Sequence, residues 1–228
     1  MSFAYTFLAG HFAARRPLMV FTALIGALSA SSLAASEHSS DVATFAGGCF
    51  WCMEPPYDRQ AGVISTRSGY TGGERENPTY QEIGRGDTGH AQAVEVVFDP
   101  DQISYEQLLE IFWYNVDPFA VDQQFCDVGT QYRSAIFYHD EEQRELAEAT
   151  KAEIEQRFER EVATQIMPAS EFWEAEEYHQ AYYQKNPLRY RFYRYNCGRD
   201  NRLEEVWGED AGGPTFNESQ AAYSRQHP

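Results

Sequence analysis

Basic residues are scarce in this chain. Its 228 residues include 18 Lys and Arg against 35 Asp and Glu, which gives a formal net charge of −17 at pH 7. Proteins bind nucleic-acid backbones through clustered positive charge, so we expect no nucleic-acid partner. Hydrophobic residues make up 43% of the chain and aromatic residues 15%. This supply of apolar side chains predicts a folded core and does not fit a disordered or low-complexity class.

Long hydrophobic runs are also missing, apart from one near the N-terminus at residues 18–28. Arg15-Arg16 precede this run, small residues follow it up to Ala34, and no acidic residue occurs before Glu37. A basic flank, an apolar middle and small residues are typical of a secretory signal. The run is short of the about 20 residues that span a membrane, although an uncleaved anchor is the alternative. We expect cleavage after Ala34 and a soluble, exported, monomeric protein in the periplasm.

The remaining chain predicts one domain. Residues 35–41 are interpreted as a linker, residues 42–207 as a single domain that includes a C-terminal tail, and residues 208–228 as disordered. Short β-rich and helix-compatible segments alternate in the order strand, helix, strand, strand, helix, strand from residue 42 to residue 138. This order predicts an α+β fold, a two-layer mixed sandwich with a ferredoxin-like βαββαβ core. A Tyr-rich helix over residues 172–184 and an extended tail over residues 186–207 are expected to follow.

Cysteine is rare, with four residues: Cys49, Cys52, Cys126 and Cys197. In an oxidising compartment an even number usually forms structural disulfides, but a chain of this length does not need them to hold a core. Cys49 and Cys52 form a C-x-x-C, a spacing that also serves redox chemistry or metal binding. A structural zinc site usually needs a second pair of ligands, and here the other two cysteines stand apart, so we expect no metal.

Cys49 is the strongest candidate for a reactive group. It follows Gly47-Gly48 and precedes Phe50-Trp51 at the point where a strand gives way to a helix. A thiol at a helix N-terminus faces free N–H groups and the positive end of the helix dipole, which both favour the thiolate. The alternative is a buried cysteine that only packs in the core. Two neighbouring aromatic side chains are also what a pocket for a methyl group requires.

Several motifs in this chain resemble those of the peptide methionine sulfoxide reductase A family. They span residues 42–188 in order and comprise Gly48-Cys49-Phe50-Trp51, Gly69-Tyr70-Thr71-Gly72-Gly73, Asn77-Pro78-Thr79-Tyr80, Gly86-Asp87-Thr88-Gly89-His90-Ala91, Gly129-Thr130-Gln131-Tyr132-Arg133-Ser134 and Tyr178-His179-Gln180. The resemblance implies a thiol-dependent enzyme without a cofactor. Its substrates would be methionine S-sulfoxides, free or in oxidised proteins, which it would repair by reduction.

The resemblance also implies roles for single residues. Cys49 matches the nucleophile, and Phe50 and Trp51 match the pocket for the substrate methyl group. The residues that match the binding site of the sulfoxide oxygen are Tyr80, Asp127 and Tyr132. Gln92 departs from the family, which usually has a glutamate there that supplies a proton. Glutamine donates a hydrogen bond but is no acid, and Glu95 is expected on the other face of the strand.

The expected reaction ends in a disulfide. Cys49 would take the oxygen as a sulfenic acid, a second cysteine would condense with it, and a thioredoxin-like reductant would restore the thiols. We expect Cys197, on the tail, to be the resolving cysteine, with Cys52 as the alternative and Cys126 inert. Two rival functions are a general C-x-x-C thiol–disulfide oxidoreductase of the exported compartment, and a binding domain in which the cysteines are only structural.

Overall fold

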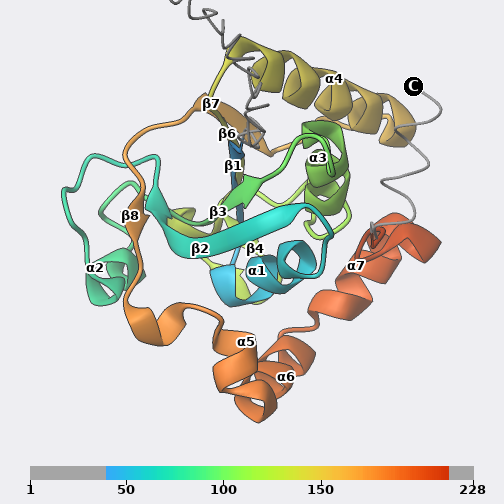
Figure 1. Ribbon diagram of the computed structural model, residues 1–228. Coiled ribbons are helices and arrows are strands. Elements are labelled where there is room, and N and C mark those ends of the chain that lie inside the picture. The colour runs from blue at the N-terminus through green and yellow to red at the C-terminus, as the bar shows by residue number, and fades with distance from the viewer. Residues whose placement is uncertain (1–39, 216–228) are drawn as a thin grey trace, which may run out of the picture. The chain divides into compact units, whose positions relative to one another are not determined.

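The computed structural model describes residues 40–215 (Figure 1). The predicted signal at residues 1–34 and most of the predicted linker at residues 35–41 therefore lie outside the described residues. Within the described range, no helix combines the length and the apolar character needed to cross a membrane.

A six-stranded mixed sheet forms the centre of the domain. Its spatial order is β7 (Gln165–Pro168), β6 (Ser134–Tyr138), β1 (Asp41–Gly47), β3 (Ala91–Phe98), β2 (Val63–Thr71) and β8 (Trp173–Glu174). All neighbours pair antiparallel except β6 and β7, which are parallel. The four central strands, β6, β1, β3 and β2, are in this order the fourth, first, third and second strands of the βαββαβ unit. This interleaved order confirms the predicted ferredoxin-like core.

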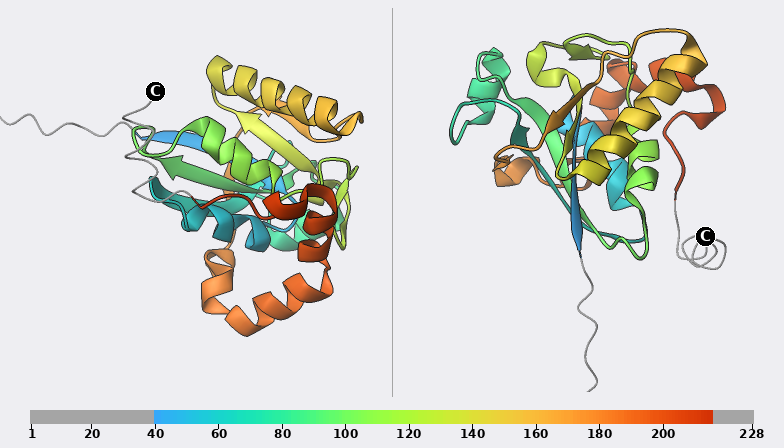
Figure 2. Two further views of the ribbon diagram at one scale, coloured as in Figure 1. Left: turned by 90° about the vertical axis from the view of Figure 1, so that its right-hand side faces the viewer. Right: turned by 90° about the horizontal axis from the view of Figure 1, so that it is seen from above.

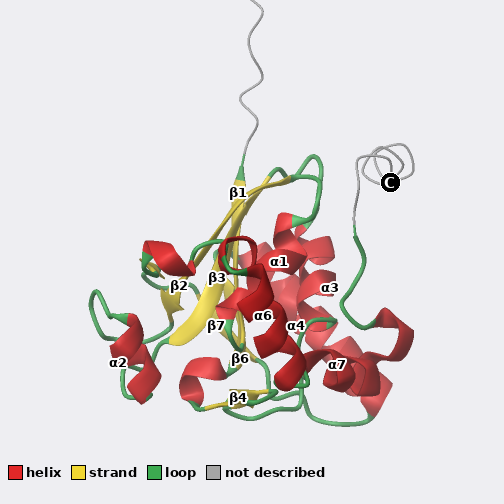
Figure 3. Cartoon of the chain, turned by 90° about the horizontal axis from the view of Figure 1, so that it is seen from below, coloured by secondary structure: helices red, strands yellow, loops and turns green. Residues whose placement is uncertain are grey.

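Three helices cover one face of the sheet, as Figure 3 shows. They are α1 (Phe50–Asp58), α3 (Tyr105–Trp113) and α4 (Glu141–Phe158). The side chains of Ser104 and Asp140 accept hydrogen bonds from backbone N–H groups at the starts of α3 and α4, as expected for N-caps. Between sheet and helices, Phe45 of β1 stacks on Tyr57 of α1 and on Phe112 of α3 at centroid distances of 5.3 and 5.4 Å. This layer packs α1 and α3 against the sheet.

The two long loops of the sequence contain short elements. The loop at residues 74–90 includes α2 (Tyr80–Arg85), which Thr79 and Glu82 begin with a capping box. The loop at residues 118–131 includes the hairpin of β4 (Gln123–Gln124) and β5 (Asp127–Val128), and the 3-10 turn η1 (Thr130–Tyr132) follows directly. Both loops lead to the region around Cys49.

The C-terminal third differs from the prediction. The expected helix at residues 172–184 is instead β8, the 3-10 turn η2 (Glu177–His179) and α5 (Tyr182–Lys185). Trp173 pairs with Tyr70 at the edge of the sheet, and this tertiary contact prevails over the local helical pattern.

The expected extended tail is also helical. It forms α6 (Pro187–Asn196) and α7 (Arg199–Trp207), with Gly198 at φ +67° between them. These helices gather near α1 in Figures 1 and 2. The ordered chain continues past residue 207, because η3 (Gly208–Asp210) follows and the Gly212 N–H donates to the Tyr114 carbonyl. The predicted disorder from residue 208 is therefore wrong up to residue 215, and residues 216–228 lie outside the described range.

Candidate active site

Two glycines shape the turn that presents Cys49 at the N-cap of α1. A Cβ on Gly47 would lie 2.6 Å from Met53 Sδ, and a Cβ on Gly48 would lie 2.6 Å from Gln124 Cβ. Gly48 also has φ +86°, a conformation that other residues rarely adopt. The chain therefore passes from β1 into α1 through a gap that only glycine fits.

Cys52 lies one helical turn from Cys49, and its backbone N–H donates to the Cys49 carbonyl at 2.9 Å. Both cysteines carry free thiols, and both are buried, with exposed fractions of 6% for Cys49 and 2% for Cys52. Their side chains hydrogen-bond each other. Two thiols at this spacing can meet as nucleophile and resolving partner without any movement of the backbone elements.

The two thiols have pKa values that are shifted in opposite directions. Burial raises the pKa of Cys49 well above its usual value, and Cys52 and Asp127 beside it add to that shift. The hydrogen bond from Cys49 lowers the pKa of Cys52 to about 7, against the opposing effect of burial. Burial thus opposes the effect that the helix N-terminus is expected to have on Cys49. The two thiols titrate as a coupled pair, in which Cys52 loses its proton more readily than Cys49.

A buried cation accounts for part of the charge on Cys52. Arg199, the first residue of α7, is 1% exposed and donates to the carbonyls of Asn115 at 2.6 Å and Gly47 at 3.3 Å. Together with Arg194 it lowers the pKa of Cys52 through its positive charge. The sequence analysis did not single out Arg199, which it placed in the expected extended tail.

An aromatic cavity opens at Trp51, which stands between the two thiols in the sequence, and Cys126 and Cys197 also border this cavity. Its volume is about 570 Å³, and Trp51, Tyr80, His179, Tyr182 and Tyr193 form much of its wall. Phe50 is fully buried behind it and packs against His179 at a centroid distance of 5.1 Å. The structure thus brings Phe50 and Trp51 together at one apolar wall, as the sequence predicts for a methyl-sized pocket.

Trp51 is fixed on two sides. Its ring stacks on Tyr182 with centroids 3.8 Å apart and planes 7° from parallel, and its Nε1–H donates to His179 Nδ1 at 2.9 Å. Burial lowers the pKa of His179 to about 4, so the imidazole is neutral at pH 7 with its proton on Nε2. His179 therefore acts on the pocket by holding the indole in place.

The polar residues predicted for the sulfoxide oxygen gather around Cys49, and Tyr80 also lines the cavity. Tyr80 begins α2, Tyr132 ends η1 and Asp127 lies in β5. Burial raises the pKa of Tyr132 to about 12 and raises the pKa values of Tyr80 and Asp127 as well. Both phenols therefore keep their protons at neutral pH and are able to donate hydrogen bonds.

Gln92 of β3 lies at the start of α1. Its Oε1 accepts a hydrogen bond from the Phe50 N–H at 3.3 Å, and the side chain is buried. The amide thus replaces a carboxylate at a helix N-terminus, and it supports the turn at Cys49 without offering a proton to transfer.

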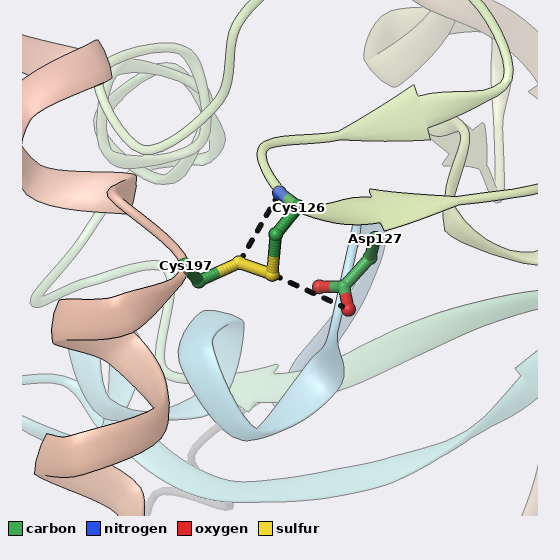
Figure 4. Close-up of side chains that lie close together, drawn as sticks. All are labelled: Cys126, Asp127 and Cys197. Carbon is green, nitrogen blue, oxygen red and sulfur yellow. Dashed lines mark hydrogen bonds between the residues drawn. A yellow bond between two sulfur atoms is a disulfide. The ribbon is translucent and has the colours of Figure 1, made fainter.

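The two remaining cysteines are joined to each other. Cys126, in the β4–β5 hairpin, and Cys197, at the end of α6, form a disulfide beside Asp127 (Figure 4). Cys197, the expected resolving cysteine, therefore has no free thiol in this structure. Cys52 is the free thiol next to Cys49. The cluster of Cys126, Asp127 and Cys197 is the one group of potential metal ligands among residues 40–215, and its sulfurs are bonded to each other.

Tyr193 is a further residue of the site that the sequence analysis did not single out. It lies on α6, lines the cavity, and donates its hydroxyl to Asp127 Oδ2 at 2.5 Å. The Tyr193 hydroxyl also lowers the pKa of Cys49, against the larger effect of burial. Tyr193 lies one helical turn before Cys197, on a helix that the sequence analysis did not predict. No hydrophobic periodicity in this segment marks Tyr193 as part of a site.

Fold and site together define a thiol-based oxidoreductase, in which a C-x-x-C pair lies beside an apolar cavity with phenol donors. The model of the family "Peptide methionine sulfoxide reductase" matches residues 41–211. Peptide methionine sulfoxide reductases MsrA from Bacillus licheniformis and Bacillus subtilis are each 50% identical to this chain. They align over 170 and 174 residues, which cover 74% and 75% of this chain and 94% and 98% of the relatives.

Two solved structures are similar. The reduced form of Mxr1 from Saccharomyces cerevisiae has a TM-score of 0.63 and 32% identity, and the alignment covers 65% of this chain and 87% of the yeast chain. Methionine sulfoxide reductase A of Corynebacterium diphtheriae has a TM-score of 0.61 and 34% identity, with 67% and 78% covered. The chain belongs to the peptide methionine sulfoxide reductase A family. Its activity is that of a peptide-methionine (S)-S-oxide reductase.

Proposed function

We propose that Cys49 attacks the sulfur of methionine S-sulfoxide, that Cys52 resolves the resulting sulfenic acid, and that a thioredoxin-like dithiol reduces the disulfide. The proximity of the two free thiols carries this proposal. Cys49 and Cys52 lie one helical turn apart beside an aromatic cavity, whereas Cys126 and Cys197 are bonded to each other.

Substrate binding would combine an apolar wall with polar donors near Cys49. The wall formed by Phe50 and Trp51 would hold the S-methyl group, because apolar surfaces favour its removal from water. The phenols of Tyr80 and Tyr132 would donate to the sulfoxide oxygen. A donor aimed at developing negative charge contributes about 3 kcal/mol in a well-formed site, so two of them would account for a large part of the rate.

Resolution then requires only the neighbouring thiol. The sulfur of Cys52 attacks the sulfenic sulfur of Cys49, an S–S bond forms, and the hydroxyl group leaves as water with the thiol proton of Cys52. The low pKa of Cys52, about 7, favours this attack at neutral pH, since the thiolate is the stronger nucleophile. The positive charges of Arg199 and Arg194 support this state.

Recycling follows ordinary thiol–disulfide exchange. An external dithiol attacks the Cys49–Cys52 disulfide and forms a mixed disulfide. Its second thiol then releases the reduced enzyme, and the dithiol leaves as a disulfide, so the cycle needs no bound cofactor. A dithiol of the thioredoxin type fits this role by its chemistry.

The substrates we propose are oxidised proteins of the exported compartment. The cavity is larger than one methionine side chain, and its rim carries Tyr178 and Phe192 with exposed fractions of 57% and 71%, which would accept apolar neighbours of an oxidised methionine. The basic pair and apolar run of residues 15–28 support export to the periplasm. Determination of the N-terminal residue of the protein isolated from its host would test the proposed cleavage after Ala34.

The activity is tested with separated sulfoxide epimers. The reduced protein is incubated with a blocked methionine S-sulfoxide or R-sulfoxide and dithiothreitol, and the thioether is quantified. We expect thioether from the S epimer only, and none from the Cys49→Ser variant. Formation of no thioether from either epimer by the wild-type protein would refute the proposed function.

A further inference from the structure

Helix α6 carries apolar side chains at positions where a surface helix usually carries polar ones. Leu188, Phe192 and Tyr195 have exposed fractions of 75%, 71% and 82%. Their spacing of i, i+4 and i+7 places them on one face of the helix, and this row is the outer face of α6. Figure 1 shows α6 at the outer edge of the domain. Exposed apolar residues are ordinary when scattered singly, but a contiguous apolar patch marks an interaction site.

The outer face is continuous with the aromatic cavity. Phe192 belongs to both, because it also lines the cavity together with Arg189 and Asn196 of the same helix. Tyr193 and Cys197, which are less exposed, line the cavity as well. A polypeptide that inserts one side chain into the cavity can therefore lay its neighbouring residues along the outer face of α6.

Positive charge lies on both sides of the outer face. Helix α6 contains three arginines and no acidic residue, although the whole chain has a net charge of −17. Arg194 pairs with Asp200. Arg189 and Arg191 are exposed, and within residues 40–215 neither forms an ion pair with a carboxylate. At about 100° per residue, Arg189 lies on the cavity side of the apolar row and Arg191 on the opposite side.

We propose that the outer face of α6 binds the residues next to the oxidised methionine of a polypeptide substrate, with a preference for apolar and acidic side chains. This inference rests on the proposed function and names the class of substrate that the site selects. The apolar row matches apolar neighbours of the methionine, and the two arginines without ion pairs match carboxylates.

The length of the outer face limits how far the preference extends along the substrate. Leu188 and Tyr195 are seven residues apart, which is about 10 Å of helix. An extended chain covers that distance with about three residues. The preference therefore concerns side chains within about three positions of the methionine.

The expected preference is modest, because the face is exposed. A substrate phenylalanine with about half of its surface covered should bind about fivefold better than a serine. An exposed ion pair improves affinity by at most about fivefold. The effect of charge should also weaken at high ionic strength, since salt screens exposed charges.

The test compares three short blocked peptides, each with one central methionine S-sulfoxide, and uses dithiothreitol as reductant. Within three positions on both sides of the methionine, the first carries phenylalanine and glutamate, the second phenylalanine and lysine, and the third serine and glutamate. We expect kcat/KM for the first to exceed each of the others about fivefold, through KM. Equal values for all three overturn the proposal.

Two double variants assign the preference to α6. Leu188→Gln with Tyr195→Gln keeps good helix formers, and it should remove the advantage of the phenylalanine–glutamate peptide over the serine–glutamate peptide. Arg189→Gln with Arg191→Gln should remove its advantage over the phenylalanine–lysine peptide. Each kcat/KM is divided by the value for a single blocked methionine S-sulfoxide, so that a general loss of activity cancels. Variants that keep both preferences overturn the proposal.

Matched controls remove the same kinds of side chain elsewhere. Ile64→Gln on β2, where the side chain is 58% exposed, and Arg59→Gln at the end of α1 should keep both preferences. An effect of the α6 variants that appears only when a thioredoxin replaces dithiothreitol would assign this face to the reductant and overturn the proposal. A wild-type dimer that dissociates in these variants would assign it to a second copy and overturn the proposal too. A wild-type protein that reduces no sulfoxide at all refutes the proposed function itself.

Discussion

Replacement of both Cys126 and Cys197 by serine removes the covalent link between the β4–β5 hairpin and the end of α6. The two residues are 71 positions apart in the chain. The loop-closure entropy of a loop of that length corresponds to about 4 kcal/mol of the free energy of unfolding. Small domains have only about 5–15 kcal/mol in total, so this is a large share. For a domain of this size the midpoint of thermal unfolding should fall by roughly 10 °C.

The same variant decides which cysteine resolves. If Cys52 resolves, the double serine variant still forms one disulfide per turnover, and peptide mapping finds it between Cys49 and Cys52. The matched variant Cys52→Ser should release thioether once and stop with an oxidised Cys49. The assay combines thioether release without reductant with mass mapping of the alkylated protein. A double serine variant that releases thioether but leaves Cys49 as a sulfenic acid would refute the assignment of Cys52.

Three further outcomes are expected. Because the pKa of Cys52 is about 7, the rate at which the Cys49 sulfenic acid disappears should fall about tenfold per pH unit below pH 7 and level off above it. Trapping with dimedone measures this rate, and a flat profile from pH 5.5 to 8.5 would contradict the lowered pKa of Cys52. Burial raises the pKa of Glu54 to about 7, so between about pH 4.5 and 7 the folded state keeps a proton that the unfolded state has lost, and this group makes the free energy of unfolding fall as pH rises through that window. In urea titrations, Glu54→Gln should therefore be as stable as the wild type near pH 4.5 and more stable at pH 8, by at most about 3 kcal/mol. Gly48→Ala should lower the free energy of unfolding by about 1–3 kcal/mol and slow the enzyme, because Gly48 has φ +86° and an added Cβ would meet Gln124. An added Cβ at Gly84 meets no atom within 4 Å, so Gly84→Ala should not destabilise the protein, and equal unfolding midpoints for the two variants would show that the turn at Cys49 is not tightly packed.

The sequence predicts the core of this fold because its signals are local. The predicted alternation of strands and helices from residue 42 to residue 138 matches the order of β1, α1, β2, β3, α3 and β6, the elements of the βαββαβ core. The order of the elements then limits the topology to few alternatives. The sequence analysis missed the helices of residues 187–207 because few of their apolar side chains are buried. Leu203 and Trp207 are buried, but arginine and tyrosine dominate the remaining positions.

The site is predictable only in part for the same reason. Cys49, Phe50 and Trp51 stand together in the sequence, so their proximity follows from the chain itself. The contacts of Tyr193 with Asp127 and of Arg199 with the Gly47 carbonyl join residues 66 and 152 positions apart. No periodic pattern encodes such pairs, and the charge they impose on the two thiols depends on burial that only the folded chain has. The pairing of Cys126 with Cys197 belongs to the same class of long-range information.

The location of Arg199 near the C-terminal end of the domain has a consequence for biosynthesis. A chain made or translocated from its N-terminus exposes Cys49 and Cys52 well before α7 emerges. Until this helix docks, the cation that favours deprotonation of Cys52 is absent, and Cys52 has the ordinary pKa of a free thiol. The last segment of the chain thus completes the charge environment of a residue near the first, and the lowered pKa of Cys52 arises only when the whole domain has folded.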